Sequence, residues 1–210
     1  MELCDRGSLQ DAIDQGWLRS RHRPAASPAR VAATALEVAR GMRELHRAGV
    51  LHGDLQGDSV LLSSHGPGAS VAGRGFVARV ADFGFSRVTR YGEDLLQSNA
   101  YGVVGYTAPE VLQTAAAVSK AADVYSFGVL LWSMWTGSRP WAGMTSSAVI
   151  DAVARQRRSL VFPEDAPSEI ADLGRACMRP DAGSRPSFGA AEAKLAAFLA
   201  GLHHNHFEDL

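Results

Sequence analysis

The segment from Val124 to Trp135 is apolar on nearly every face of the helix it would form. A helix of this kind is buried on all sides, so the rest of the chain has to pack around it. The segment contains Ser126 and Gly128 and is too short to cross a bilayer. Asp123 just before it is the predicted N-cap. With 210 residues, of which 46% are hydrophobic and 20% charged, the chain fits one globular domain with a sizeable core.

A second constraint is the stretch Leu51–Leu62, which places the carboxylate of Asp54 in a short polar turn. A helical pattern ending at Val50 precedes this turn, and the strand-like segment Val60–Leu62 follows it. A carboxylate in such a turn, backed by a core, is positioned like a general base or a cation ligand. The alternative is a turn aspartate that bonds only to its own backbone.

A long helix is predicted to lead into this turn. Ser27 is a typical N-cap, and Pro28 suits the first helical position. The apolar residues that follow recur at spacings of four and three, as in one buried stripe: Val31, Ala35, Val38, Met42 and Leu45. Gly49 is a typical helix stop. We expect this helix to be central and buried.

Around this helix the sequence predicts a short helix and a strand pair. Ser8 followed by Asp11 is typical of a capping box at a helix start. The predicted strands are Val60–Ser63 and Phe76–Ala81. The loop 64–75 is rich in Gly and Ser and is typical of a flexible hairpin tip. It does not fit a phosphate-binding loop, because Val71 stands where a third glycine would be needed.

Further helices are predicted near residues 146–156 and 168–178, with a last helix ending at about Leu199. Residues 201–210 are expected to be a polar, disordered tail. The tail contains His203, His204 and His206, so a metal site is the alternative there.

The net charge of −1 gives no long-range attraction to nucleic acid or to an anionic membrane. Two groups of basic residues are expected to be solvated surface: Arg19, Arg21 and Arg23, and Arg155, Arg157 and Arg158. The two cysteines, Cys4 and Cys177, form no disulfide or zinc framework. We expect Cys177 in the core and Cys4 on a segment that can line a pocket.

The N-terminal residues do not resemble a signal peptide, and the sequence shows no segment long enough to span a membrane. These features predict a cytoplasmic location, unless the chain is part of a longer membrane receptor.

Three short motifs occur in order along the chain: His52-Gly53-Asp54, Ala81-Asp82-Phe83-Gly84 and Ala108-Pro109-Glu110. In this order and spacing they resemble the catalytic loop, the metal-binding motif and the end of the activation segment of a protein kinase. The segments Asp123-Val124-Tyr125-Ser126-Phe127-Gly128 and Arg185-Pro186-Ser187-Phe188 resemble the tyrosine-kinase-like group, whose members mostly phosphorylate serine and threonine.

This resemblance implies a protein-kinase-like α+β fold, present only as its C-terminal lobe. Residues 1–200 would run from the hinge to the last helix, mainly helical with a small β-hairpin. The N-terminal lobe would be absent. The surface that normally meets it would be exposed or covered by a partner.

The resemblance also implies roles for individual residues. The catalytic positions would be Asp54 and Gln56, and Mg²⁺ would be held by Asp82 and Ser59. ATP would meet the backbones of Glu2 and Cys4, with Leu61 under the adenine and Met1 as gatekeeper. His52 and Phe83 would link two loops, Asp123 would anchor the catalytic loop, and Glu110 would pair with Arg185. The partner would be a protein substrate.

Four positions depart from the kinase pattern. Gly53 replaces an arginine that senses activation-loop phosphate, and Gln56 replaces a lysine that meets the γ-phosphate. Ser59 replaces an asparagine that holds a second Mg²⁺, and Val103 replaces a threonine that contacts the catalytic aspartate. Losing one electrostatic stabiliser of this sort costs about 3–4 kcal/mol in the transition state.

Three interpretations follow from these matches and departures. The chain is a truncated piece of an active protein kinase, inactive alone; or it is a pseudokinase scaffold that binds without catalysis. The third is a small-molecule kinase of the choline and aminoglycoside type, which shares His52-Gly53-Asp54 but usually lacks the later motifs. We favour the first.

Overall fold

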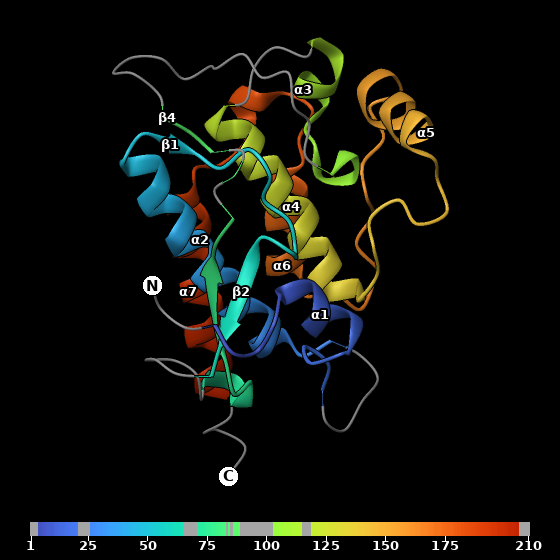
Figure 1. Ribbon diagram of the computed structural model, residues 1–210. Helices are drawn as coiled ribbons and strands as arrows, with labels where there is room; N and C mark the ends of the chain where they lie inside the picture. Colours follow the sequence, from blue (N-terminus) through green and yellow to red (C-terminus); the bar gives the residue numbers. More distant parts are fainter. Residues whose placement is uncertain are drawn as a thin grey trace.

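The computed structural model describes residues 4–20, 26–64, 71–82, 84, 86–88, 103–114 and 119–205. In this part of the chain a bundle of helices surrounds α4 (Lys120–Thr136), with one β-hairpin packed against α2 (Pro28–Arg47) (Figure 1). The expected mainly helical kinase lobe with a small hairpin is therefore confirmed. Within the same residues, no helix has both the length and the hydrophobicity needed to pass through a bilayer.

Helix α4 forms the centre of the core, as its apolar surface requires. It packs against α2 and against α6 (Ser168–Cys177), while α7 (Phe188–Asn205) lies along α2. The rings of Phe127 on α4 and Phe188 on α7 meet edge to face, with centroids 5.4 Å apart. Burial on all faces leaves α4 little freedom to shift, so it can serve as the reference element for the loops around it.

The predicted N-cap of α4 was wrong. The helix begins three residues before Asp123, and its N-cap is Ser119, whose hydroxyl accepts from the backbone N–H of Ala122 at 3.1 Å. Ser119 is extended and its side chain satisfies an otherwise free N–H of the first turn. The carboxylate of Asp123 is therefore not needed by the helix and is used elsewhere.

Helix α2 follows its sequence signals closely. Ser27 caps it and Pro28 opens it, and the predicted stripe is buried from Val31 to Met42, whereas Leu45 is half-buried. The helix ends at Arg47, before the predicted Val50, because Gly49 adopts a φ of +72°. The next residues form β1 (Val50–Leu51), which pairs antiparallel with β4 (Arg87–Val88). This short strand pair was not predicted.

The hairpin consists of β2 (Val60–Ser63) and β3 (Val77–Val80), antiparallel, with Val60 opposite Val80. Both predicted strands are confirmed. The first helix, α1 (Leu9–Asp14), has the predicted capping box between Ser8 and Asp11.

Part of the connection predicted as a flexible tip is well anchored. Residues 65–70 lie outside the described residues, but the next three form a 3₁₀ turn, η1 (Val71–Gly73). The guanidinium of Arg30 donates to the carbonyls of Ala72 and Gly73, and also to those of Trp17 and Arg19. One side chain of α2 therefore holds two irregular segments.

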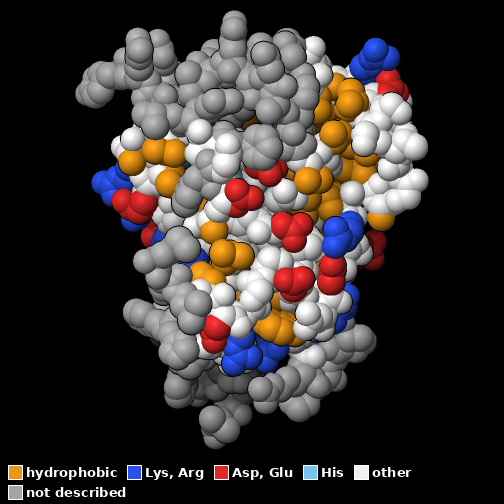
Figure 2. Space-filling view, viewed as in Figure 1, with side chains coloured by type: hydrophobic (Ala, Val, Ile, Leu, Met, Phe, Trp, Pro, Cys, Tyr) orange, Lys and Arg blue, Asp and Glu red, His pale blue; other side chains and the backbone are white. Residues whose placement is uncertain are grey.

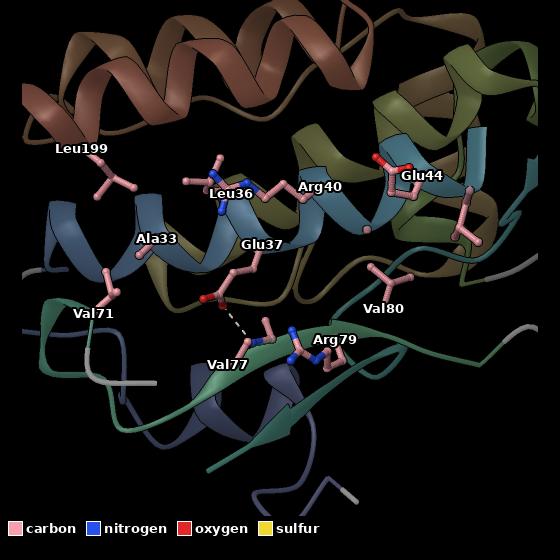
Figure 3. Close-up of a pocket in the computed structure, with 13 residues that line it drawn as sticks. Ala33, Leu36, Glu37, Arg40, Glu44, Val71, Val77, Arg79, Val80 and Leu199 are labelled. Carbon is pink, nitrogen blue, oxygen red and sulfur yellow. Dashed lines mark hydrogen bonds between the residues drawn. The ribbon is translucent and has the colours of Figure 1, made fainter. Parts of the chain in front are cut away.

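A buried ion pair ties the hairpin to α2. The side chain of Arg74 has no exposed surface and donates to both carboxylate oxygens of Glu37, at 2.9 and 2.6 Å. Glu37 also accepts from the backbone N–H of Ala78 on β3 at 2.8 Å, the bond drawn in Figure 3. A groove of about 460 Å³ lies above this contact, between α2, β3 and the end of α7.

The remaining elements lie toward the C-terminus. They are α3 (Pro109–Thr114), η3 (Val104–Tyr106), α5 (Ser146–Ile150), a π-helical turn η4 (Asp151–Arg155) and η5 (Ala182–Ser184). The helices predicted near 146–156 and 168–178 are present. Arg155, Arg157 and Arg158 are exposed, as expected, whereas Arg21 and Arg23 lie outside the described residues.

The last helix is longer than predicted. It continues past Leu199 to Asn205, so residues 201–205, expected as tail, are helical. Gly201 is a typical stop residue, but it adopts no positive φ and lies inside the helix, where the Ala- and Leu-rich sequence around it favours helix. Residues 206–210, including His206, lie outside the described part of the chain.

Stability should fall at alkaline pH because two buried groups resist ionisation. Burial raises the pKa of the Cys177 thiol from 9.0 to about 12, and that of Tyr125 from 10.0 to about 12. Unfolding exposes both groups, so the unfolded state loses their protons first as the pH rises from about 9 toward 12. These two groups should therefore lower the free energy of urea unfolding as the pH rises above about 9, and should have little effect at neutral pH.

The variant Cys177→Ala should delay this decrease, since Tyr125 and Tyr106, whose pKa values burial raises, then remain, and their effect begins nearer pH 10. Cys4→Ala, which removes the half-buried thiol, is the control. A decrease that starts at the same pH in wild type and Cys177→Ala would contradict the assignment.

Candidate active site

The turn that carries Asp54 is anchored to the core by Asp123. The Asp123 carboxylate is buried and accepts from the backbone N–H groups of His52 and Gly53, both at 2.9 Å. It also contacts Nε2 of His46 at 2.8 Å. The predicted anchoring contact is thus present. Gly53 has a φ of +79°, which glycine adopts without strain, so the turn suits this residue.

His52 links the same turn to the strand end that precedes Asp82. Its buried ring accepts from the backbone N–H of Asp54 at Nδ1, 3.3 Å away, so Nε2 is left to donate to the carbonyl of Ala81 at 2.9 Å. The N–H of Ala81 in turn donates to the carbonyl of Ser59 at 2.8 Å. His52 before Asp54 and Ser59 after it therefore both bond to Ala81, the residue that precedes Asp82. Phe83 lies outside the described residues.

The two predicted catalytic side chains touch each other. The amide of Gln56 donates to Oδ2 of Asp54 at 3.1 Å. The other carboxylate oxygen, Oδ1, accepts from the backbone N–H of Val103 at 3.3 Å. Both donors are neutral, so they orient the carboxylate without neutralising its charge. Asp54 is half-buried, and lone pairs remain for a further donor.

Ser59 is used inside the turn. Its buried hydroxyl accepts from the N–H of Gln56 at 2.9 Å and donates to the carbonyl of the same residue at 3.0 Å. This pair of bonds closes the loop around Gln56. A hydroxyl engaged in this way has one lone pair left, so it fits a metal ligand less well than the asparagine of the kinase pattern.

Asp82 suits Mg²⁺ as a single carboxylate. It is exposed, has a φ of +56° and accepts from the N–H of Gly84 at 3.3 Å. Within the described residues, no three His, Cys, Asp or Glu side chains are grouped to hold a metal ion. Mg²⁺ is usually bound by one or two carboxylates together with waters and substrate phosphates. Asp82 therefore fits as a single protein ligand for Mg²⁺ that binds together with a nucleotide.

The segment expected to meet adenine runs beside β2. The N–H of Arg6 donates to the carbonyl of Leu62, and the N–H of Leu62 donates to the carbonyl of Gly7. Half-buried Leu61 lies opposite Ser8, and half-buried Cys4 precedes this contact. The structure therefore brings the segment after Cys4 to the strand of Leu61. Glu2 and Met1 lie outside the described residues.

A groove of about 250 Å³ begins at Gln56, in the turn that also carries Asp54. Gln56 and Asp58 lie at one end, and the ion pair of Arg139 with Asp14, 2.8 Å long, lies nearby. The apolar lining comes from η3, α5 and the segment before α5: Val103, Val104, Trp141, Met144 and Val149. Figure 2 shows acidic side chains gathered over the middle of this face, between the catalytic turn and α1. Bound phosphates would need a cation here.

The predicted ion pair at the other side of α4 is formed. Arg185 donates to both oxygens of Glu110, at 2.7 and 2.8 Å, and to the carbonyls of Ala121, Arg179 and Pro180. Its side chain is fully buried, and its guanidinium lies 5.1 Å from the ring centre of Tyr125. The pair holds α3, and with it the end of the activation segment, against the helices.

Together these features define a protein-kinase-like fold: a carboxylate turn fixed by a buried helix, a second carboxylate at the neighbouring strand end, and an ion pair that anchors the end of the activation segment. The sequence pattern of the family "Protein tyrosine and serine/threonine kinase" matches residues 1–195. The chain therefore belongs to the protein tyrosine and serine/threonine kinase family.

Known relatives agree with this assignment. The chain is 35% identical over 198 residues to "Probable serine/threonine-protein kinase SIS8" of Arabidopsis thaliana, covering 92% of this chain and 17% of that protein. It is 35% identical over 169 residues to human "Mitogen-activated protein kinase kinase kinase 11", covering 79% and 19%. With "Mitogen-activated protein kinase kinase kinase dlk-1" of Caenorhabditis elegans it shares 31% over 188 residues, covering 90% and 18%.

The expected place in the tyrosine-kinase-like group is confirmed by these relatives. The chain spans less than a fifth of the length of each of these three. The small-molecule kinase interpretation receives no support from them.

Sequence reasoning missed several contacts at the site and at the hairpin. The N–H of Val103 and the hydroxyl of Thr107 near Asp54 were not predicted, nor was the pair of Glu37 with Arg74. A threonine four residues after Val103 was visible in the sequence, but nothing local indicated its partner.

Removing one oxygen of the Asp123 carboxylate should loosen the catalytic turn. In Asp123→Asn one acceptor becomes an NH₂ group, which cannot accept from His52 or Gly53. We expect a loss of about 3 kcal/mol in the free energy of unfolding, measured by urea denaturation. Hydrogen exchange at the His52 and Gly53 amides should also become faster.

The matched control is Asp172→Asn, which changes an exposed carboxylate on α6 and should alter stability by less than about 0.5 kcal/mol. Equal stabilities for Asp123→Asn and wild type would show that the buried carboxylate is not the anchor.

Proposed function

We propose that this chain is the C-terminal lobe of a protein kinase that transfers the γ-phosphoryl group of ATP to serine or threonine hydroxyls of a protein substrate. The observation that carries the proposal is the Asp54 carboxylate, held on its two oxygens by Gln56 and Val103, both of which line the groove of about 250 Å³. The names of the relatives support serine and threonine as acceptors.

Asp54 would orient the substrate hydroxyl and accept its proton. Its orientation is fixed by Gln56 and Val103, and its free lone pairs face the remaining space of the turn. Positioning of this kind supplies much of the catalysis in phosphoryl transfer, because the protein does little covalent chemistry.

Charge neutralisation is the weaker part of this site. Gln56 offers an amide in place of an ammonium group, and the lysines of the chain, Lys120 and Lys194, lie at the start of α4 and on α7. Mg²⁺, when bound at Asp82, supplies positive charge to the phosphates. A slow enzyme is the consequence of this distribution of charge.

The protein substrate would lie in the groove that starts at Gln56. Apolar residues from η3 and α5 line the groove, and Asp58 provides a charge at its end. Gln56 and Val103 both line the groove and donate to Asp54, so a peptide in it would lie beside this carboxylate. We also propose a cytoplasmic location, and a partner that covers the surface that an N-terminal kinase lobe would meet.

The alternative function is that of a pseudokinase scaffold. It is favoured by the hydroxyl of Ser59, which is occupied within its own loop, and by the neutral Gln56 beside Asp54. A scaffold would keep the fold and the groove but would transfer no phosphate.

Phosphoryl transfer can be tested in the longest natural polypeptide that contains this chain. With Mg²⁺, ATP and a general acceptor protein, we expect slow labelling of serine or threonine. Asp54→Asn should lower the rate at least about 100-fold, because the proton acceptor is lost. Asp151→Asn, at an exposed carboxylate on η4, is the control and should leave the rate unchanged. Absence of transfer, or equal rates for wild type and Asp54→Asn, would favour the scaffold.

The 210-residue chain alone should bind Mg²⁺-ATP weakly or not at all. It offers the adenine side of the site around Leu61, and Asp82 as its metal ligand, but no phosphate-binding loop was found in its sequence. Isothermal calorimetry measures this directly. A micromolar dissociation constant would show that the described residues suffice for nucleotide binding.

A further inference from the structure

The activation segment reaches Asp54 through a backbone group. Val103 has a 49% exposed side chain, yet its N–H donates to Oδ1 of Asp54 at 3.3 Å. In the kinase pattern a threonine stands here and offers a hydroxyl. Valine has none, so in this chain the contact depends on how well the backbone at Val103 is held.

The carbonyl of Val103 accepts two hydrogen bonds. One comes from the backbone N–H of Tyr106 at 2.9 Å, which closes the 3₁₀ turn η3. The other comes from the hydroxyl of Thr107 at 3.3 Å. Both lone pairs of this carbonyl are therefore used, and the peptide after Val103 has little freedom to rotate.

Thr107 is itself firmly placed. Its N–H donates to the carbonyl of Val104 at 3.2 Å, and the preceding carbonyl, of Tyr106, accepts from the Ser126 hydroxyl of α4 at 2.8 Å. Thr107 also lines the same narrow cavity as Asp54 and Asp123. The backbone just before Thr107 is thus tied to the central helix, and the Thr107 hydroxyl is bonded to Val103.

We propose that Thr107 is a positioning residue for Asp54, acting through Val103. Its hydroxyl donates to the Val103 carbonyl. The carbonyl and the N–H of Val103 are attached to the same Cα, so holding the carbonyl also positions the N–H that donates to Oδ1 of Asp54. The chain thereby recovers, from four residues downstream, the contact that a threonine at 103 would make directly. The effect of Thr107 on catalysis rests on the proposed phosphoryl transfer, whereas its effect on the bond between Val103 and Asp54 does not.

The chain contains a matched control for this bond. Thr136 also donates from its hydroxyl to a carbonyl four residues earlier, that of Trp132, at 3.0 Å. This bond lies at the C-terminal end of α4, where the last turn of the helix carries it. Thr136→Val therefore removes the same type of bond at a distant place.

The test compares Thr107→Val, Thr107→Ser and Thr136→Val in the 210-residue chain by amide NMR. In wild type, the Val103 N–H signal should shift as Asp54 is titrated with acid, because it donates to that carboxylate. Thr107→Val should at least halve this shift and speed hydrogen exchange of the Val103 amide about fivefold, the loss of one hydrogen bond. Thr107→Ser and Thr136→Val should behave as wild type.

A rescue variant keeps the test decisive if Thr107→Val is poorly folded. Val103→Thr supplies a hydroxyl at the position next to Asp54, so the double variant Val103→Thr/Thr107→Val should regain the acid-dependent signal at residue 103. In the longer polypeptide, Thr107→Val should lower kcat and leave KM for ATP unchanged.

An unchanged Val103 signal in Thr107→Val, or an equal change in Thr136→Val, would overturn the proposal. Because the NMR readout needs no phosphoryl transfer, an inactive wild type would contradict only the proposed function. If the Val103 signal of Thr107→Val changes as expected but kcat of this variant equals that of wild type, only the catalytic consequence is refuted.

Discussion

The Asp123 carboxylate is the interaction on which the site depends. It lies on the most buried helix of the described structure and accepts from two consecutive N–H groups of the turn that carries Asp54. A buried carboxylate is costly unless its lone pairs are used, and here His46 provides a further partner. The position of Asp54 is therefore set by the packing of α4, and the turn needs no secondary structure of its own.

Three arginine side chains hold other irregular segments in place. Arg30, Arg74 and Arg185 each donate to backbone carbonyls, and the last two also form buried pairs with Glu37 and Glu110. The planar guanidinium offers five donors, so one side chain can satisfy several carbonyls that no strand or helix would satisfy. These contacts are architectural, since breaking such a pair costs roughly 3–5 kcal/mol.

Sequence reasoning succeeded where the signal was local. Ser27 and Pro28 define the start of α2, Ser8 and Asp11 define α1, and the strand-like apolar runs of β2 and β3 define the hairpin. Each of these signals comes from neighbours within one turn or one strand. The kinase resemblance was equally accessible, because it rests on short motifs in a fixed order.

The failures concern partners far apart in the chain. The N-cap of α4 was assigned to Asp123 because an acid before an apolar run is a typical cap, whereas its acceptors serve a turn some seventy residues earlier. Val50 was assigned to a helix because an apolar residue fits either period, and its pairing with Val88 decided otherwise. No local pattern reports contacts of this kind.

The departures at Gln56, Ser59 and Val103 have different physical consequences. At Val103 the lost hydroxyl is replaced by a backbone N–H, so the orientation of Asp54 is retained. At Ser59 the shorter side chain still closes the turn through two bonds to Gln56. The serine is nevertheless a weaker metal ligand than asparagine, and at Gln56 a charge is lost, because an amide can orient the carboxylate but carries no charge. The site thus retains the positions of its side chains better than their charges. The proposed phosphoryl transfer is therefore expected to be slow.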